Sequence, residues 1–239
     1  MRTDQYFEDR PMNEFPWYFR WLYNFIVGFL YVFCHIYWPH TYENVEALAP
    51  AGKTHGRVII CNHTSMPEVV VIVTEMWKRK RRVRPLYKSE FGRIRIVGWL
   101  FTRVAGGVAL HRGTADLRAL RAAQHALKHG EDVLIFPEGT RIRTDDQPVE
   151  VHNGFALIAQ MGKANILPTA VCGFRDLTPP GKLIARPGRV WLRAGSEISF
   201  SDAPQDMKRS ERLSWIESFC AQKMYELRDS LKAQHPGRN

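Results

Sequence analysis

Residues 57–68 read Arg-Val-Ile-Ile-Cys-Asn-His-Thr-Ser-Met-Pro-Glu, and the rest of the chain is organised around them. The apolar run from Arg57 to Cys61 predicts a buried β-strand, and Pro67 followed by Glu68 predicts the entry to a helix. His63 then stands at a strand-to-helix turn, which is where α/β folds keep their active crevices. This stretch therefore predicts an α/β fold with a histidine in the crevice.

His63 and Glu68 have the chemistry of a general base and its orienting group. An imidazole titrates near ~6.5, so it can take a proton at neutral pH. A carboxylate on its other ring nitrogen would fix the tautomer and stabilise the imidazolium that forms. The alternative is a capped turn, in which Glu68 only interacts favourably with the helix dipole.

The charge balance of the 239-residue chain indicates an acidic partner. Lys and Arg number 34 and Asp and Glu 24, which gives a net charge of +10. Nucleic acid, anionic lipid or a phosphorylated substrate would each satisfy that charge. The aromatic residues cluster in apolar runs and do not interleave with the basic ones, which disfavours nucleic acid.

Cysteine usage predicts thiols in a reducing compartment. The four cysteines lie far apart in apolar surroundings and are Cys34, Cys61, Cys172 and Cys220. This pattern forms neither a metal-ligand cluster nor a disulfide framework, and we expect no metal site.

An aromatic, apolar stretch follows sixteen polar residues near the start of the chain. Those sixteen residues lack the layout of a signal peptide because acidic residues precede the apolar stretch. From Trp21 to Trp38, a helix would span about 27 Å, slightly less than a ~30 Å hydrocarbon core. Rings of Trp and Tyr at both ends favour headgroup depth. We expect an embedded or interfacial membrane helix ending at Pro39, with a packed core helix as the alternative.

Two further stretches favour a membrane surface. The basic run 78–82, Lys-Arg-Lys-Arg-Arg, would attract anionic lipid, although a solvated face is the alternative. The apolar stretch from Ile94 to Val104 carries arginines, so it is expected to lie along the surface or a lipid groove. Nearer the end, Lys182 to Ser199 predicts two short strands, and a core-packed helix is expected from about Ser210.

A second informative turn follows the strand predicted at Asp132 to Ile135. It reads Phe-Pro-Glu-Gly-Thr-Arg at residues 136–141. Gly139 lets the backbone approach a ligand closely, and Thr140 and Arg141 can bind phosphate oxygens. Glu138 can accept hydrogen bonds from ligand hydroxyls. A surface ion pair is the alternative for this turn.

Four short motifs occur in order along the chain. They are Asn62-His63-x4-Glu68, Gly106-x-Val108-Ala109-Leu110-His111-Arg112, Phe136-Pro137-Glu138-Gly139-Thr140-Arg141 and Ile166-Leu167-Pro168-Thr169-Ala170-Val171. Together they resemble the four motifs of the glycerolipid acyltransferases, in particular the bacterial 1-acyl-sn-glycerol-3-phosphate acyltransferases. The likeness spans about residues 40 to 200, and the third motif is its most specific part.

The resemblance implies a fold and a reaction. The fold would be a single α/β acyltransferase domain at residues 40–239, with a mixed central sheet flanked by helices, after a membrane-binding segment at residues 1–39. The reaction would move an acyl chain from acyl-CoA or acyl carrier protein to a lysophospholipid hydroxyl, most simply that of 1-acylglycerol 3-phosphate. No other cofactor is expected, and the domain would lie on the cytoplasmic side of an anionic membrane.

The resemblance also implies residue roles. His63 would deprotonate the acceptor hydroxyl, with Glu68 in place of the family's usual aspartate. Arg112, Lys88 and residues 138–141, Glu138, Gly139, Thr140 and Arg141, would hold the glycerol phosphate. Two alternatives remain: another lysolipid as acceptor, or a non-catalytic basic protein that binds lipid surfaces.

Overall fold

A mixed sheet forms the centre of the protein. The computed structural model describes residues 3–48, 55–90, 95–110, 116–179, 181–182 and 185–236. The strands are β1 His40–Glu43, β2 Val58–Cys61, β3 Val83–Lys88, β4 Val108–Leu110, β5 Asp132–Ile135, β6 Ile166–Cys172 and β7 Val190–Ala194. They form one seven-stranded sheet in the order β1-β7-β6-β2-β5-β3-β4. Only the β6–β7 pair of this sheet is antiparallel, so the predicted mixed sheet is confirmed.

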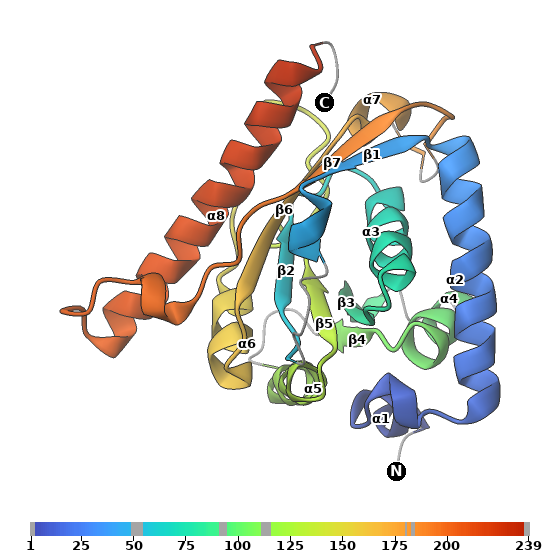
Figure 1. The fold of residues 1–239 in the computed structure, drawn as a ribbon, viewed down its shortest axis with the longest axis horizontal. Helices are drawn as coiled ribbons and strands as arrows, with labels where there is room; N and C mark the ends of the chain where they lie inside the picture. Colours follow the sequence, from blue (N-terminus) through green and yellow to red (C-terminus); the bar gives the residue numbers. More distant parts are fainter. Residues whose placement is uncertain are drawn as a thin grey trace.

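Helices cover both faces of the sheet. The α-helices are α1 Thr3–Glu8, α2 Trp17–Tyr37, α3 Pro67–Lys78, α4 Arg95–Trp99, α5 Leu117–Lys128, α6 Gly154–Gly162, α7 Phe174–Leu177 and α8 Arg209–Gln234. A π-helical turn, η4 Leu100–Val104, continues α4, and short 3-10 turns lie at η1 Met12–Glu14, η2 Val45–Leu48 and η5 Phe200–Asp202. Helices α5, α6 and α8 lie on one side of the sheet, and α2, α3 and α4 lie on the other (Figure 1).

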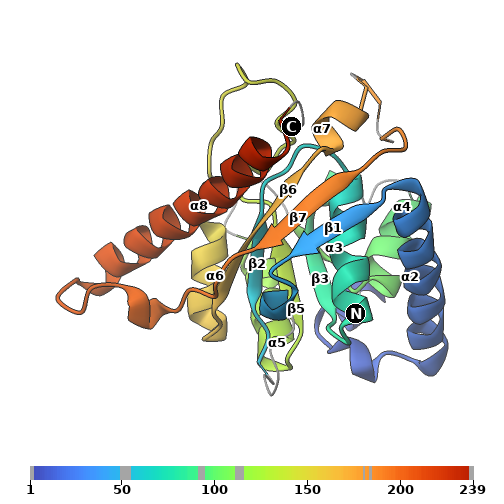
Figure 2. The same cartoon turned by 45° about the horizontal axis from the view of Figure 1, so that its top comes forward.

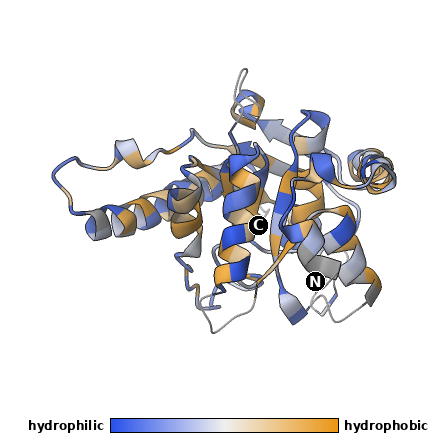
Figure 3. Ribbon diagram, turned by 90° about the horizontal axis from the view of Figure 1, so that it is seen from below, coloured by the Kyte–Doolittle hydropathy of each residue, from blue (hydrophilic) through white to orange (hydrophobic). Residues whose placement is uncertain are grey.

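The central strand β2 is buried on both faces. Ile59 and Cys61 belong to the core that includes α2 and α3, whereas Val58 and Ile60 pack in the core with α5, α6 and α8. A strand covered on both faces needs apolar residues at every position, which explains the unbroken run in the sequence. Apolar residues run through the centre of the molecule in Figure 3.

One of the two strands predicted between Lys182 and Ser199 is present, and the other is absent from the described residues of that range. Within the described part of that range, β7 is the strand, and Ile198 forms only an isolated bridge with Ile166. Before β7 in the chain, the Arg186 N–H donates to the Leu177 carbonyl at the end of α7. These residues find their hydrogen-bond partners in a turn, so they are not available to a strand ladder.

Helix α2 begins at Trp17, one turn before the predicted start, and ends at Tyr37. One face packs on α3, with Tyr23, Val27 and Cys34 buried, while the other face is exposed. The exposed apolar residues on α2 are Trp17, Tyr18, Trp21, Phe25, Phe29, Val32, Phe33 and Ile36. Within the described residues, α2 is the one helix long and apolar enough to cross a bilayer. Figure 2 shows it at the edge of the molecule, opposite α8.

The basic run is less available to lipid than its sequence indicates. Arg79 pairs with Glu75, Arg81 pairs with the buried Asp132, and the Arg82 guanidinium lies 5.1 Å from the centre of the Tyr23 ring. The two lysines of the run are exposed. For the stretch from Ile94 to Val104, Ile94 lies outside the described residues, and Thr102 and Val104 are buried.

Candidate active site

The carboxyl ends of the parallel strands bring the two informative turns together. Strand β2 lies between β5 and β6, with Ile60 beside Ile135 and Cys61 beside Thr169. Parallel neighbours end at the same edge of a sheet, so the residues that follow β2 and β5 meet there. His63 follows β2 and Glu138 follows β5.

The His63 side chain is held by Glu68 at the start of α3. His63 Nδ1 lies 2.8 Å from Glu68 Oε2, and the Glu68 side chain is fully buried. A carboxylate only accepts hydrogen bonds, so Nδ1 carries the proton. The neutral ring then presents the lone pair of Nε2 as a base.

Glu68 also caps the turn, so the two interpretations of this residue both describe it. Its Oε1 accepts hydrogen bonds from the Thr64 and Ser65 backbone N–H groups at 3.0 Å each, and from the Thr64 hydroxyl. These hydrogen bonds to Oε1 fix the orientation of the carboxylate, so that Oε2 faces the imidazole. Glutamate reaches His63 across this turn despite being one methylene longer than the aspartate usual in the resembling family.

The backbone of His63 is tied to the second turn on both sides. Its N–H donates to Glu138 Oε2 at 2.8 Å, and its carbonyl accepts from the Ile142 N–H at 2.7 Å. Its ring stacks on Phe136, with ring centres 4.1 Å apart. The two turns therefore face each other in one site, and the histidine has little freedom to rotate.

Asn62 is a structural member of the site that the sequence did not assign a role. Its side-chain amide donates to the Val171 carbonyl at 3.0 Å and accepts from the Val171 N–H at 2.9 Å. The Asn62 side chain thus makes the two hydrogen bonds to β6 that a backbone peptide group would make in a strand pair. Its position directly before His63 was the available signal.

Glu138 contacts the protein more than the sequence predicts. Its Oε2 accepts from His63, and its Oε1 accepts from the Tyr225 hydroxyl of α8 at 3.1 Å. Burial raises the pKa of the Glu138 carboxyl to about 7; the charge of Glu68 adds to this, and the two hydrogen bonds oppose it. Sequence reasoning missed Tyr225 because α8 carries only a core-packing pattern.

Arg141 supplies a positive charge to the same edge. Within the described residues, its half-buried guanidinium makes no hydrogen bond or ion pair. Burial lowers the pKa of Arg141, the charge of Arg143 lowers it further, and Glu68 acts in the opposite direction. A guanidinium in this state is suited to bind an anion.

The remaining predicted residues are placed as follows. Gly139 adopts a left-handed backbone, with φ at 58°, which allows the turn, and Thr140 is exposed beside it. Lys88 is half-buried at the end of β3, beside Leu110 of β4, at the same sheet edge but two strands from β2. Arg112 and His111 lie outside the described residues.

Comparisons with known proteins identify the family of this chain. The Acyltransferase family model matches residues 40–172. A 1-acyl-sn-glycerol-3-phosphate acyltransferase of Bacillus subtilis is 27% identical over 74% of this chain and 83% of its own length. A protein of the same description from Streptococcus pneumoniae is 35% identical over 48% of this chain and 40% of its own length.

A solved structure shares the fold. The 1-acyl-sn-glycerophosphate (LPA) acyltransferase PlsC from Thermotoga maritima superposes with a TM-score of 0.62 and 23% sequence identity. The match covers 86% of this chain and 80% of that one.

Proposed function

The chain belongs to the acyltransferase family, and from this premise we propose that it acylates 1-acylglycerol 3-phosphate to give phosphatidic acid. Relatives described as 1-acyl-sn-glycerol-3-phosphate acyltransferases support this acceptor. The observation that carries the proposal is the His63 base, bound to Glu68 at 2.8 Å and fixed opposite the turn that bears Arg141. The acyl donor is acyl-CoA or acyl carrier protein, and no other cofactor takes part.

The proposed reaction is direct acyl transfer. Nε2 of His63 removes the proton from the acceptor hydroxyl as its oxygen attacks the thioester carbonyl, and Glu68 stabilises the imidazolium. The tetrahedral intermediate collapses with loss of the thiolate, which takes the proton back from His63. The ester bond replaces the thioester bond, and no covalent acyl-enzyme forms.

The phosphate of the acceptor is assigned to the turn after β5. Arg141 binds two phosphate oxygens, and the Thr140 hydroxyl and the Gly139 backbone line the same turn. Lys88, at the end of β3, and Arg112, which lies outside the described residues, are further candidates. Glu138 acts mainly by holding His63, since both its oxygens already accept hydrogen bonds from the protein.

The exposed aromatic face of α2 supports membrane association. Trp and Tyr side chains settle at headgroup depth, and a net charge of +10 favours an anionic surface. We assign the catalytic domain to the cytoplasmic side, where acyl thioesters are supplied. A non-catalytic lipid-binding role is less favoured because it leaves the buried His63–Glu68 pair without a purpose.

An acceptor panel tests the proposal. Membrane fractions receive labelled acyl-CoA with lysophosphatidic acid, lysophosphatidylcholine or monoacylglycerol, and Arg141→Gln is measured beside the wild type. We expect lysophosphatidic acid to be preferred, and Arg141→Gln to raise its KM about 10- to 100-fold, since hydrogen bonds to charged groups contribute ~1.5–3 kcal/mol.

His63→Ala is the control for background acylation. Equal product from this variant and the wild type would remove the enzymatic role. Equal use of monoacylglycerol and lysophosphatidic acid by the wild type would remove the phosphate monoester as the recognised group.

A further inference from the structure

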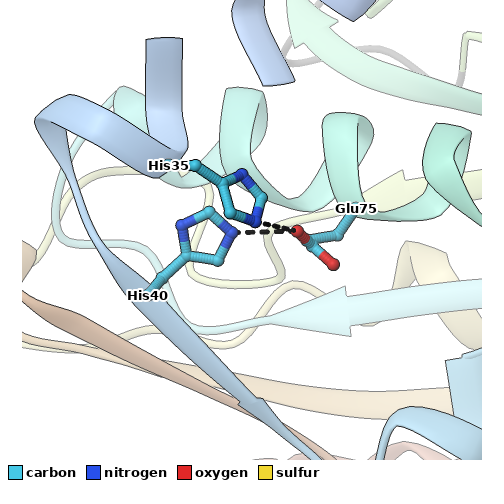
Figure 4. Close-up of side chains that lie close together, drawn as sticks. All are labelled: His35, His40 and Glu75. Carbon is cyan, nitrogen blue, oxygen red and sulfur yellow. Dashed lines mark hydrogen bonds and ion pairs between the residues drawn. The ribbon is translucent and has the colours of Figure 1, made fainter. Parts of the chain in front are cut away.

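Two histidines and a glutamate from three separate segments converge at the end of α2. His35 lies in the last turn of α2, His40 opens β1, and Glu75 lies on α3 (Figure 4). The Nε2 atoms of His35 and His40 lie 3.5 and 2.9 Å from Glu75 Oε1. All three ligand atoms fall within 4.8 Å of one another.

Both rings are oriented by backbone carbonyls. His35 Nδ1 lies 2.9 Å from the Tyr31 carbonyl oxygen, and His40 Nδ1 lies 2.8 Å from the Trp38 carbonyl oxygen. A carbonyl oxygen only accepts hydrogen bonds, so each Nδ1 carries a proton. Each neutral ring therefore directs the lone pair of Nε2 at a carboxylate oxygen. Three electron-pair donors facing one point repel one another unless a cation or protons on the rings lie between them.

We propose that His35, His40 and Glu75 form a site for a divalent transition metal ion, with zinc the best fit. Zinc bonds to histidine nitrogen and carboxylate oxygen measure ~2.0–2.2 Å, so tetrahedral ligand atoms stand about 3.3 Å apart. The two separations from Glu75 Oε1, 2.9 and 3.5 Å, lie on either side of that spacing. Imidazole and carboxylate ligands suit zinc.

The surroundings have the supporting contacts of a metal site. Metal-binding histidines commonly donate their other N–H to a backbone carbonyl, as both rings do here. Arg79 binds Oε2 of Glu75, which leaves Oε1 directed at the histidines. The side chains of His40 and Glu75 are almost fully buried, whereas that of His35 is 39% exposed and leaves a way in. Three protein ligands leave a fourth position for water.

The position of the site indicates what the ion does. It joins α2, which carries the exposed aromatic face, to β1 and α3 of the acyltransferase domain. None of its three ligands takes part in the acyl transfer described above. The ion would therefore fix the membrane-facing helix to the domain. The spacing of residues 35, 40 and 75 along the chain matches no known metal-binding motif, so the sequence did not predict a metal site.

The test uses the full-length chain in detergent, without a histidine tag and stripped with a chelator. Cobalt(II) is titrated and followed by its visible d–d absorption, zinc is used to displace it, and bound metal is counted by mass spectrometry. We expect one equivalent of zinc per chain and a melting temperature several degrees higher with the ion, since a ligand that binds only the folded state stabilises it.

Variants locate the ion. His35→Gln is the main variant because its ring is partly exposed, and His40→Gln and Glu75→Gln complete the set. Each should weaken zinc at least about a hundredfold and abolish the zinc-dependent rise in melting temperature. The matched control is the His125→Gln, His129→Gln double variant, which removes another close histidine pair with ring centres 4.1 Å apart.

Three results would overturn the proposal. They are no stoichiometric binding at micromolar zinc in the wild type, unchanged binding in His35→Gln with native circular dichroism, or loss of binding in the control double variant. The first would mean that protons occupy the cluster, as a pair of charged histidines beside Glu75. Binding of zinc by the wild type and the control, and its loss in His35→Gln, would establish the site.

Discussion

Two glutamates hold His63 from opposite turns. The Glu68 carboxylate contacts His63 Nδ1 at 2.8 Å and also accepts hydrogen bonds from the backbone N–H groups of the turn before α3. The Glu138 carboxylate accepts a hydrogen bond from the His63 backbone N–H at 2.8 Å. The position of the imidazole therefore depends on both carboxylates.

Glu138 should make the stability of the protein depend on pH. Its pKa of about 7 lies above the ordinary value of ~4.3. Between about pH 4.3 and pH 7, the Glu138 carboxyl is therefore protonated in the folded state and ionised in the unfolded chain. Stability from this group is therefore full at low pH and lost as pH rises through 7. The expected loss between pH 5 and pH 8 is on the order of 2 kcal/mol.

Urea unfolding of the wild type and Glu138→Gln at the two pH values measures this contribution. The variant should lose less stability than the wild type as pH rises, because glutamine does not titrate. Parallel pH dependences in the two proteins would show that Glu138 ionises in the folded state as it does in the unfolded chain.

The His63 turn and its acid could be predicted because they lie within one short segment, where spacing limits geometry. The contacts of Asn62 and Tyr225 could not be predicted, because their partners are 109 and 87 residues away in the sequence. Contacts of that kind depend on strand order and helix docking, which local patterns do not specify.

At the scale of elements, apolar patterns predicted the central strands well and the edges of the fold less well. Strand β2 stood out because both its faces are buried. Between Lys182 and Ser199, strand β7 forms as predicted, but the expected strand before it does not, because the Arg186 N–H donates to the end of α7. Helix α2 was predicted to be either a membrane helix or a core helix. In the structure, one of its faces packs in the core and the other is apolar and exposed.

The exposed face of α2 should control membrane binding. Phe25 and Phe29 are 60% and 63% exposed, and burying a phenylalanine side chain contributes ~1.5–3 kcal/mol. The Phe25→Gln, Phe29→Gln double variant should therefore bind anionic vesicles at least about tenfold more weakly, as measured by flotation. Its activity in detergent should persist. The Phe25→Leu, Phe29→Leu variant is the control and should float like the wild type; equal flotation of the glutamine variant would contradict this role of α2.

At the scale of the whole molecule, the two ends of the sheet's strands differ in function. The candidate active site occupies the carboxyl ends of β2 and β5. The amino end of β5 holds a buried ion cluster, in which Asp132 binds Arg57 and Arg81. The acyltransferase fold was predictable from ordered motifs, whereas this cluster was not, because its residues are dispersed among strands and loops.

Asp132→Asn should therefore destabilise the protein without changing substrate binding. Removing one partner of a buried ion pair costs about 3–5 kcal/mol, because uncompensated charge remains. Urea unfolding measures the loss, and KM values for both substrates should stay within twofold at a temperature where the variant is folded. Glu226→Gln breaks an exposed pair with Lys223 and should leave the free energy of unfolding almost unchanged, because water screens such a pair. Equal stability of the two variants would show that the Asp132 cluster does not hold the sheet.

The most direct test of the account is the single-turnover rate of acyl transfer at saturating lysophosphatidic acid. Rapid quenching with labelled acyl thioester compares the wild type with His63→Ala and Glu68→Gln. If His63 is the base and Glu68 orients it, the first variant should be slower by about a thousandfold or more and the second by about a hundredfold, with thioester binding unchanged. A His63→Ala rate within tenfold of the wild type would contradict the account.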